Sequence, residues 1–285
     1  MNGTFKNLII GGSKLISLPK AGFSIVELLV ALILAAIVTS AAMSLYITQH
    51  KQLLVQDQIS DMQSSVRAAT AELATKIRMA GYNIPDPVLP IVAANTNPDT
   101  ITIAYDESGG VNIAIAHAMP QPSAELRCDD SDLSALHDND YLYIYDPATK
   151  TGEFFLATHI QYSSGHIQHN TANLSRAYPV GSQIFKIRRF KYYIDNTSDA
   201  NHPNFMIAAD GNQGQVFAEN ITNLNFSYKL SSGAIVDIPP LSDMIREVII
   251  TVNARAERAD TDFRARNYRT RTLSTRVKVR NLGVN

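Results

Sequence analysis

Residues 23–47 read FSIVELLVALILAAIVTSAAMSLYI, the most apolar stretch of this 285-residue chain. No charged side chain occurs from Leu28 to Gln49. Leu28 to Ile47 supplies about 20 residues, which at ~1.5 Å of helical rise each match the thickness of a bilayer's hydrocarbon core. The sequence therefore predicts a membrane-spanning helix close to the amino terminus.

The residues in front of this helix indicate its orientation. They carry Lys6, Lys14 and Lys20 and no acidic residue. Because positively charged flanks stay in the cytoplasm, residues 1–22 are predicted to be cytoplasmic and everything after about Gln49 extracytoplasmic.

Glu27 is an ionisable side chain just inside the apolar run, where burial of an unpaired charge in lipid costs about 3 kcal/mol. A secretory signal peptide is the simpler alternative, and Ala35-Ala36 or Ala41-Ala42 offer weak cleavage sites for it. A signal peptide has no use for Glu27, which favours a retained segment with a specific role.

The string KAGFSIVEL at residues 20–28 resembles the processing site of type IV prepilins. The resemblance implies that a prepilin peptidase cuts between Gly22 and Phe23 and methylates the new amino group of Phe23. Glu27 then becomes the fifth residue of the mature chain. A cut in front of the apolar segment leaves that segment attached, first as a membrane anchor and later as a packing helix in a fibre. There Glu27 would pair with the terminal amine of a neighbouring subunit.

The helical pattern continues beyond the membrane segment. Apolar residues recur at spacings of three and four, at Val55, Ile59, Met62, Val66, Ala69, Leu73 and Ile77. Gly81 and Pro85 are a stop signal. We therefore predict one helix from Phe23 to Ala80, of roughly 58 residues. A coiled coil is the alternative explanation of the stripe, and packing against a sheet of the same chain is favoured.

From about Ile101 the apolar period changes from 3.6 to 2. The predicted strands are Thr100–Tyr105, Tyr141–Tyr145, Glu153–Ala157, Gln183–Arg188, Leu224–Leu230, Val248–Val252 and Thr272–Arg280. The predicted fold class is α+β, with a long N-terminal helix packed on a mostly antiparallel sheet, as in pilins.

Composition excludes several other classes. The chain is 45% hydrophobic with a formal net charge of -1, which is typical of a globular protein and argues against a nucleic-acid binder. Its one cysteine, Cys128, excludes an intrachain disulfide and is best explained as a small buried side chain.

A search for catalytic or metal chemistry gives only weak candidates. His159, His166 and His169 are close in sequence, with His166 and His169 at a metal-ligand spacing but in a polar loop. Two aspartate sets without EF-hand spacing are better explained as turn and cap residues: Asp129, Asp130 and Asp132, and Asp138 and Asp140. No nucleophile elbow, P-loop or zinc-protease motif is present, so we expect no enzyme, no metal and no cofactor.

Three further segments resemble one branch of the pilin family, the PilW-type minor pilins and the related J-type minor pseudopilins of type II secretion. They are residues 65–82, 219–228 and 271–281. The resemblance implies a subunit present in few copies, which primes pilus assembly with other minor pilins near the fibre tip. Ser44 departs from the family pattern, because many major pilins have a helix-kinking proline there.

The resemblance also implies a domain order and a set of partners. Residues 1–22 are the cleaved leader, 23–49 the membrane and fibre-core half of the helix, 50–82 its amphipathic half, and 83–285 the β-rich periplasmic domain. Its partners are the prepilin peptidase, membrane lipid, the inner-membrane assembly platform, other minor pilins and the major pilin. The alternatives are a J-type pseudopilin, or a signal-anchored extracytoplasmic binding or enzymatic domain.

Residues 246–285 hold ten basic and four acidic side chains in an otherwise acidic chain. Six arginines fall in the predicted hairpin between the last two strands: Arg255, Arg258, Arg264, Arg266, Arg269 and Arg271. They form an interface for an acidic partner or for DNA or, as the favoured explanation, a solvated face that is partly paired with Glu257, Asp260 and Asp262.

Overall fold

The computed structural model describes residues 22–260, 263 and 267–282. The predicted leader, residues 1–22, lies outside the described residues except for Gly22. The chain divides into two compact units, Met1–Leu54 and Val55–Asn285.

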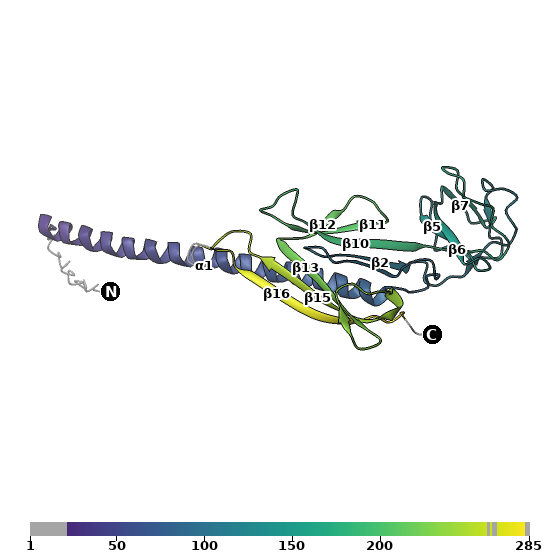
Figure 1. Cartoon of the computed structure of the whole chain (residues 1–285). Coiled ribbons are helices and arrows are strands. Elements are labelled where there is room, and N and C mark those ends of the chain that lie inside the picture. The colour runs from purple at the N-terminus through teal and green to yellow at the C-terminus, as the bar shows by residue number, and fades with distance from the viewer. Residues whose placement is uncertain (1–21, 261–262, 264–266, 283–285) are drawn as a thin grey trace, which may run out of the picture. The chain divides into compact units, whose positions relative to one another are not determined.

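One helix, α1 (Ile25–Met79), is 55 residues long and covers almost all of the predicted helical region (Figure 1). Its helical assignment is unbroken at Ser44, whose carbonyl accepts a hydrogen bond from the Thr48 hydroxyl at 2.9 Å. The prediction of one long helix is confirmed, with ends one or two residues inside the predicted ones.

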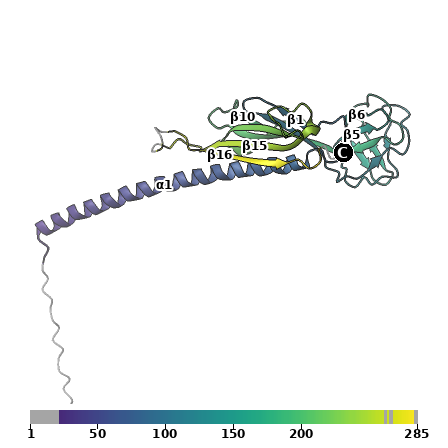
Figure 2. The same cartoon turned by 60° about the horizontal axis from the view of Figure 1, so that its bottom comes forward.

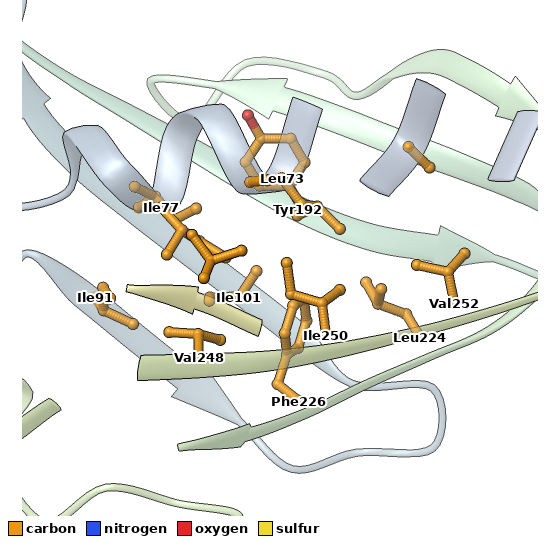
Figure 3. Close-up of a cluster of buried hydrophobic side chains, with 14 of the residues drawn as sticks. Leu73, Ile77, Ile91, Ile101, Tyr192, Leu224, Phe226, Val248, Ile250 and Val252 are labelled. Carbon is orange, nitrogen blue, oxygen red and sulfur yellow. The ribbon is translucent and has the colours of Figure 1, made fainter. Parts of the chain in front are cut away.

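The second half of α1 is the centre of the main core. Its stripe residues Met62, Val66, Ala69, Leu73 and Ile77 are all buried. They share one apolar cluster with side chains from two β-sheets (Figure 3). The stripe therefore packs against sheets of the same chain, as predicted, and a coiled coil is not needed to explain it.

Two antiparallel sheets supply the rest of this core, counted over the described residues (Figures 1 and 2). The first has the order β1-β2-β10-β11-β12, with bounds β1 (Ile91–Ala94), β2 (Thr100–Asp106), β10 (Ile187–Asp195), β11 (Asn204–Ala209) and β12 (Gln215–Glu219). The second has the order β14-β13-β15-β16, with bounds β13 (Ile221–Leu230), β14 (Ile235–Val236), β15 (Ile245–Arg255) and β16 (Thr270–Lys278).

The alternation predicted for the late strands is confirmed. Leu224, Phe226 and Tyr228 of β13 are buried on the core face, opposite Val248 and other residues of β15. The short 3-10 helix η1 (Ser242–Met244) precedes β15.

Residues 107–186 form a separate lobe inserted between β2 and β10. Its strands make two small antiparallel sheets: β3 (Ile113–Ala114), β9 (Gln183–Phe185), β5 (Tyr141–Asp146) and β6 (Thr151–Leu156) in one, and β4 (Leu126–Arg127), β8 (His166–Gln168) and β7 (His159–Gln161) in the other. The lobe has its own apolar cluster, centred on residues such as Leu136, Leu142 and Ile167. The strands that flank the lobe, β2 and β10, pair directly with each other, with Ile187 opposite Asp106.

The prediction of a single strand over Gln183–Arg188 is wrong. This stretch is divided between β9 in the lobe and β10 in the large sheet. The chain changes sheets at Lys186, whose buried ammonium lies 2.8 Å from the Asp140 carboxylate. Because the period of 2 continues through this point, the sequence pattern gives no sign of the change.

Helix α1 ends as its stop signal predicted. Gly81 has a φ of +79°, the left-handed conformation that follows many helices. The Asn281 amide lies 3.3 Å from the Ala80 carbonyl and donates to it, so the C-terminal segment caps the helix. A β-carbon on Gly81 would lie 2.5 Å from Leu282 Cδ2.

We expect Gly81→Ala to lower the free energy of unfolding by about 2 kcal/mol or more, from left-handed strain plus the clash with Leu282. Gly233→Ala is the matched control. Gly233 has a φ of +87° but no atom within 4 Å of an added β-carbon. It should therefore lose only about 1 kcal/mol. Both free energies of unfolding are measured by chemical denaturation of the detergent-solubilised chain, with tyrosine near-ultraviolet circular dichroism as the signal. Equal losses would show that the Leu282 contact does not matter.

Candidate processing and assembly site

The predicted cleavage site lies directly in front of α1. Gly22, Phe23 and Ser24 are exposed and precede the first helical residue, Ile25. A β-carbon added to Gly22 would meet no atom within 4 Å. Among the described residues, none covers the Gly22-Phe23 peptide bond.

Ser24 is the N-cap of α1, a role that the sequence analysis missed. Its carbonyl accepts the Leu28 amide at 3.1 Å, and its hydroxyl accepts the Val26 amide at 3.4 Å. Glu27 follows three residues later, in the first turn of the helix. The pattern Ser-x-x-Glu is the signature of a capping box, so this signal was present in the sequence.

The place of Glu27 in the first turn gives its carboxylate a local role at the start of α1. A carboxylate in the first turn is stabilised by the helix dipole, by about 0.3 to 1 kcal/mol. That gain is smaller than the cost of placing the carboxylate in lipid. Helix capping alone does not account for an acidic residue at this position.

The apolar half of α1 is uncovered in the single chain. Every side chain from Gly22 to Leu54 is exposed, and Phe23 retains 82% of its accessible surface. By length and composition α1 is a helix that could cross a membrane. A run of exposed leucine, isoleucine and valine side chains of this length requires lipid or other protein chains around it.

Comparison with known protein families finds a processing motif at the predicted cleavage site. Residues 18–43 match the family model described as the prokaryotic N-terminal methylation motif. A search of curated proteins gave no match. The matched stretch contains the predicted cut and most of the apolar run.

This motif supports a type IV pilin-like or pseudopilin-like protein. It implies processing by a prepilin peptidase and assembly with other pilins. Together with α1, it suggests membrane anchoring followed by incorporation into a fibre. It also suggests a structural subunit and not an enzyme.

The three histidines considered as metal ligands have separate partners. His159 Nδ1 lies 3.0 Å from the Asp138 carboxylate. His166 lies between Glu125 and Asp129, at 3.1 and 3.4 Å. His169 is buried, with its ring nitrogens 3.1 and 2.8 Å from two backbone carbonyls. Within residues 22–260, 263 and 267–282, no group of three or more His, Cys, Asp or Glu side chains is arranged to hold a metal ion.

The aspartates of the lobe act mainly in turns and ion pairs. Asp132 accepts the Ser134 amide at 2.9 Å, and Asp138 accepts the Ile160 amide at 2.7 Å. Asp140 accepts the His137 amide and pairs with Lys186. Asp129 contacts His117 and His166, while Asp130 is exposed.

Cys128 is a fully buried, free thiol. Burial, together with the nearby Asp129 charge, raises the pKa of its thiol to about 12. The thiol is therefore protonated at neutral pH and unreactive, in line with the packing role predicted for it.

The arginine-rich segment is partly used inside the chain. Arg255 donates to the Asn201 carbonyl and stacks over Tyr268, while Arg269 pairs with Asp260 at 2.8 Å. Arg258 lies 3.7 Å from Glu257. Arg264, Arg266 and Asp262 lie outside the described residues. The contacts of Arg255, Arg258 and Arg269 favour the explanation by local pairing over a dedicated interface.

Proposed function

We propose that this chain is a minor pilin subunit of the PilW type, cut between Gly22 and Phe23 and built into a type IV pilus near its tip. The observation that carries the proposal is the match of residues 18–43 to the methylation motif, together with the exposed apolar half of α1 that overlaps and follows it. In this proposal residues 1–22 are the leader, 23–49 the membrane and fibre-core segment, 50–82 the amphipathic helix, and 83–285 the periplasmic domain.

The exposed apolar half of α1 would serve two stages of this function: anchoring in the membrane and packing in the fibre. Before assembly, lipid covers the side chains between Leu28 and Ile47, with the amino terminus in the cytoplasm. During extraction from the membrane, the helices of neighbouring subunits replace the lipid. Each large aliphatic side chain contributes roughly 1.5 to 3 kcal/mol when it is kept from water, so the helix has no stable exposed state between lipid and fibre.

The inserted lobe supports a minor and not a major role. Residues 107–186 add a second hydrophobic core to the domain, distinct from the core between α1 and the two large sheets. The lobe is attached beside the end of α1, where the Tyr82 hydroxyl donates to the Gly109 carbonyl at 3.3 Å. A bulky lobe at this end of a subunit is easier to accommodate at a fibre tip than in every repeat of a fibre.

The proposal is tested by fibre composition and by gene deletion. Pili sheared from cells should contain the chain beginning at Phe23, in a small molar fraction of the major pilin, and deletion should reduce piliation. Loss of protein secretion with normal piliation would assign the chain to a type II pseudopilus. Deletion that leaves both piliation and secretion unchanged would contradict the proposal.

A further inference from the structure

A groove crosses the solvent face of the five-stranded sheet, opposite the face that covers α1. It has a volume of about 490 Å³ and is lined by side chains of β2 and β10 and by the Gly211–Gly214 loop. Along β10, the alternating residues Arg189, Lys191 and Tyr193 face this groove, while Tyr192 faces the core.

Two cations in the groove lack carboxylate partners. Among the described residues, neither Arg189 nor Lys191 makes a side-chain ion pair or hydrogen bond. Arg189 instead lies over the Phe154 ring at 4.2 Å, and Lys191 over the Tyr193 ring at 5.3 Å. By contrast, the adjacent Arg188 pairs with Asp210 at 2.6 Å and with Glu107 at 3.0 Å.

The nearest carboxylates along the chain are already engaged. Asp210 accepts both the Arg188 side chain and the Arg189 amide. Asp195 accepts hydrogen bonds from Ser198 and Thr197, which hold the pKa of its carboxyl well below the usual range. The charges of Arg189 and Lys191 are therefore available to a ligand.

The packing around Lys191 leaves space for that ligand. Its cross-strand neighbours are the small residues Thr102 and Ala208. The Gly211–Gly214 loop forms one wall, held close to Tyr193: a β-carbon on Gly214 would lie 2.2 Å from the Tyr193 hydroxyl oxygen. Asn212 and Gln213 of the same loop also line the groove.

We propose that this groove binds a short saccharide that carries carboxylate groups. Arg189 and Lys191 would bind the carboxylates, and Thr102, Asn212 and Gln213 would hydrogen-bond to the sugar hydroxyls. The proposal goes beyond the assembly function and does not depend on it.

The lining favours a saccharide over a protein or a nucleic acid. None of the residues that line the groove is a leucine, isoleucine, valine, methionine or phenylalanine that could hold an apolar anchor of a protein partner. The Tyr193 ring lies under Lys191, so this aromatic face is not free to stack on a base. Two cations are also few for a site that tracks a phosphate backbone.

The test is isothermal titration of the full chain in detergent with hexagalacturonate. The probes for comparison are maltohexaose, hexathymidylate and hexaglutamate. We expect hexagalacturonate to bind more tightly than the other three, and its affinity to fall as salt is added. Arg189→Gln/Lys191→Gln should weaken binding at least about tenfold. Arg276→Gln/Lys278→Gln, which removes two exposed cations from β16, is the matched control and should change nothing.

Two further variants separate charge from shape. Arg189→Lys/Lys191→Arg keeps both charges and should retain binding, while Gly214→Ala moves the wall at Tyr193 and should weaken it. Circular dichroism confirms that each variant is folded. The proposal is overturned if hexagalacturonate does not bind, if maltohexaose binds equally well, if hexathymidylate or hexaglutamate binds more tightly, or if the double glutamine variant binds like the control.

Discussion

Replacement of Gly22 by valine is expected to abolish removal of the leader. A protease that cuts after glycine brings its own backbone close to a residue without a side chain, and a branched side chain prevents that approach. In the chain itself, an added β-carbon at position 22 meets nothing within 4 Å. The substitution therefore leaves the fold of the substrate unchanged, and any loss of cleavage reports on the peptidase.

The measurement is the ratio of precursor to mature chain in native membranes, by intact mass. Gly22→Val should accumulate as precursor, with less than about a tenth of the wild-type mature fraction. Ser24→Ala is the control, because it removes the N-cap hydroxyl two residues beyond the cut. That change costs the helix about 1 kcal/mol, and cleavage should continue. Normal cleavage of Gly22→Val would contradict the assignment of the site.

Glu27→Gln is expected to block entry into the fibre. In the proposed fibre, the Glu27 carboxylate pairs with the terminal amine of a neighbouring Phe23. Removing one partner of a buried pair leaves an uncompensated charge, which costs roughly 3 to 5 kcal/mol. That cost lowers incorporation at equilibrium by a factor of a hundred or more.

Glutamine is chosen because it separates charge pairing from helix capping. Gln, like Glu, is favoured three residues after a serine N-cap, so the start of α1 should be unaffected. Asp57→Asn, which neutralises an exposed carboxylate of the same helix outside the apolar run, is the matched control. The amount of each variant in sheared fibres, relative to membranes, is the readout. Equal incorporation of Glu27→Gln and Asp57→Asn would remove the role given to Glu27.

The elements that could be predicted are those with a sustained period. Helix α1 carries an unbroken apolar run and then a stripe that ends at Gly81, so its length followed from sequence. Strands β13, β15 and β16 are nine or more residues long, and each contains a run of alternating apolar and polar residues. In these elements the local pattern and the tertiary packing agree.

The elements that could not be predicted lack such a period. Strands β3, β4, β7 and β8 are two or three residues long, too short for any alternation. In β11, Phe205, Met206 and Ala208 are all buried, so its two faces are not distinguished by polarity. The chain passes from the lobe to the large sheet at Lys186, whose partner Asp140 is distant in sequence.

The same contrast holds for the sites. Gly22, Phe23 and Glu27 could be proposed from sequence because a processing motif is read as a linear peptide. Arg189 and Lys191 could not, because alternating basic residues on a strand are usually a solvated face. Only the tertiary structure shows that Arg188 is paired and Arg189 is not.

The pilin assignment is best tested by the mass of the N-terminal peptide of the native protein, isolated from its own membrane. We predict a chain that begins at Phe23 and carries one added methyl group. A chain that begins at Met1, or after the apolar segment, would contradict the pilin assignment, and α1 would then be only an anchor or a signal.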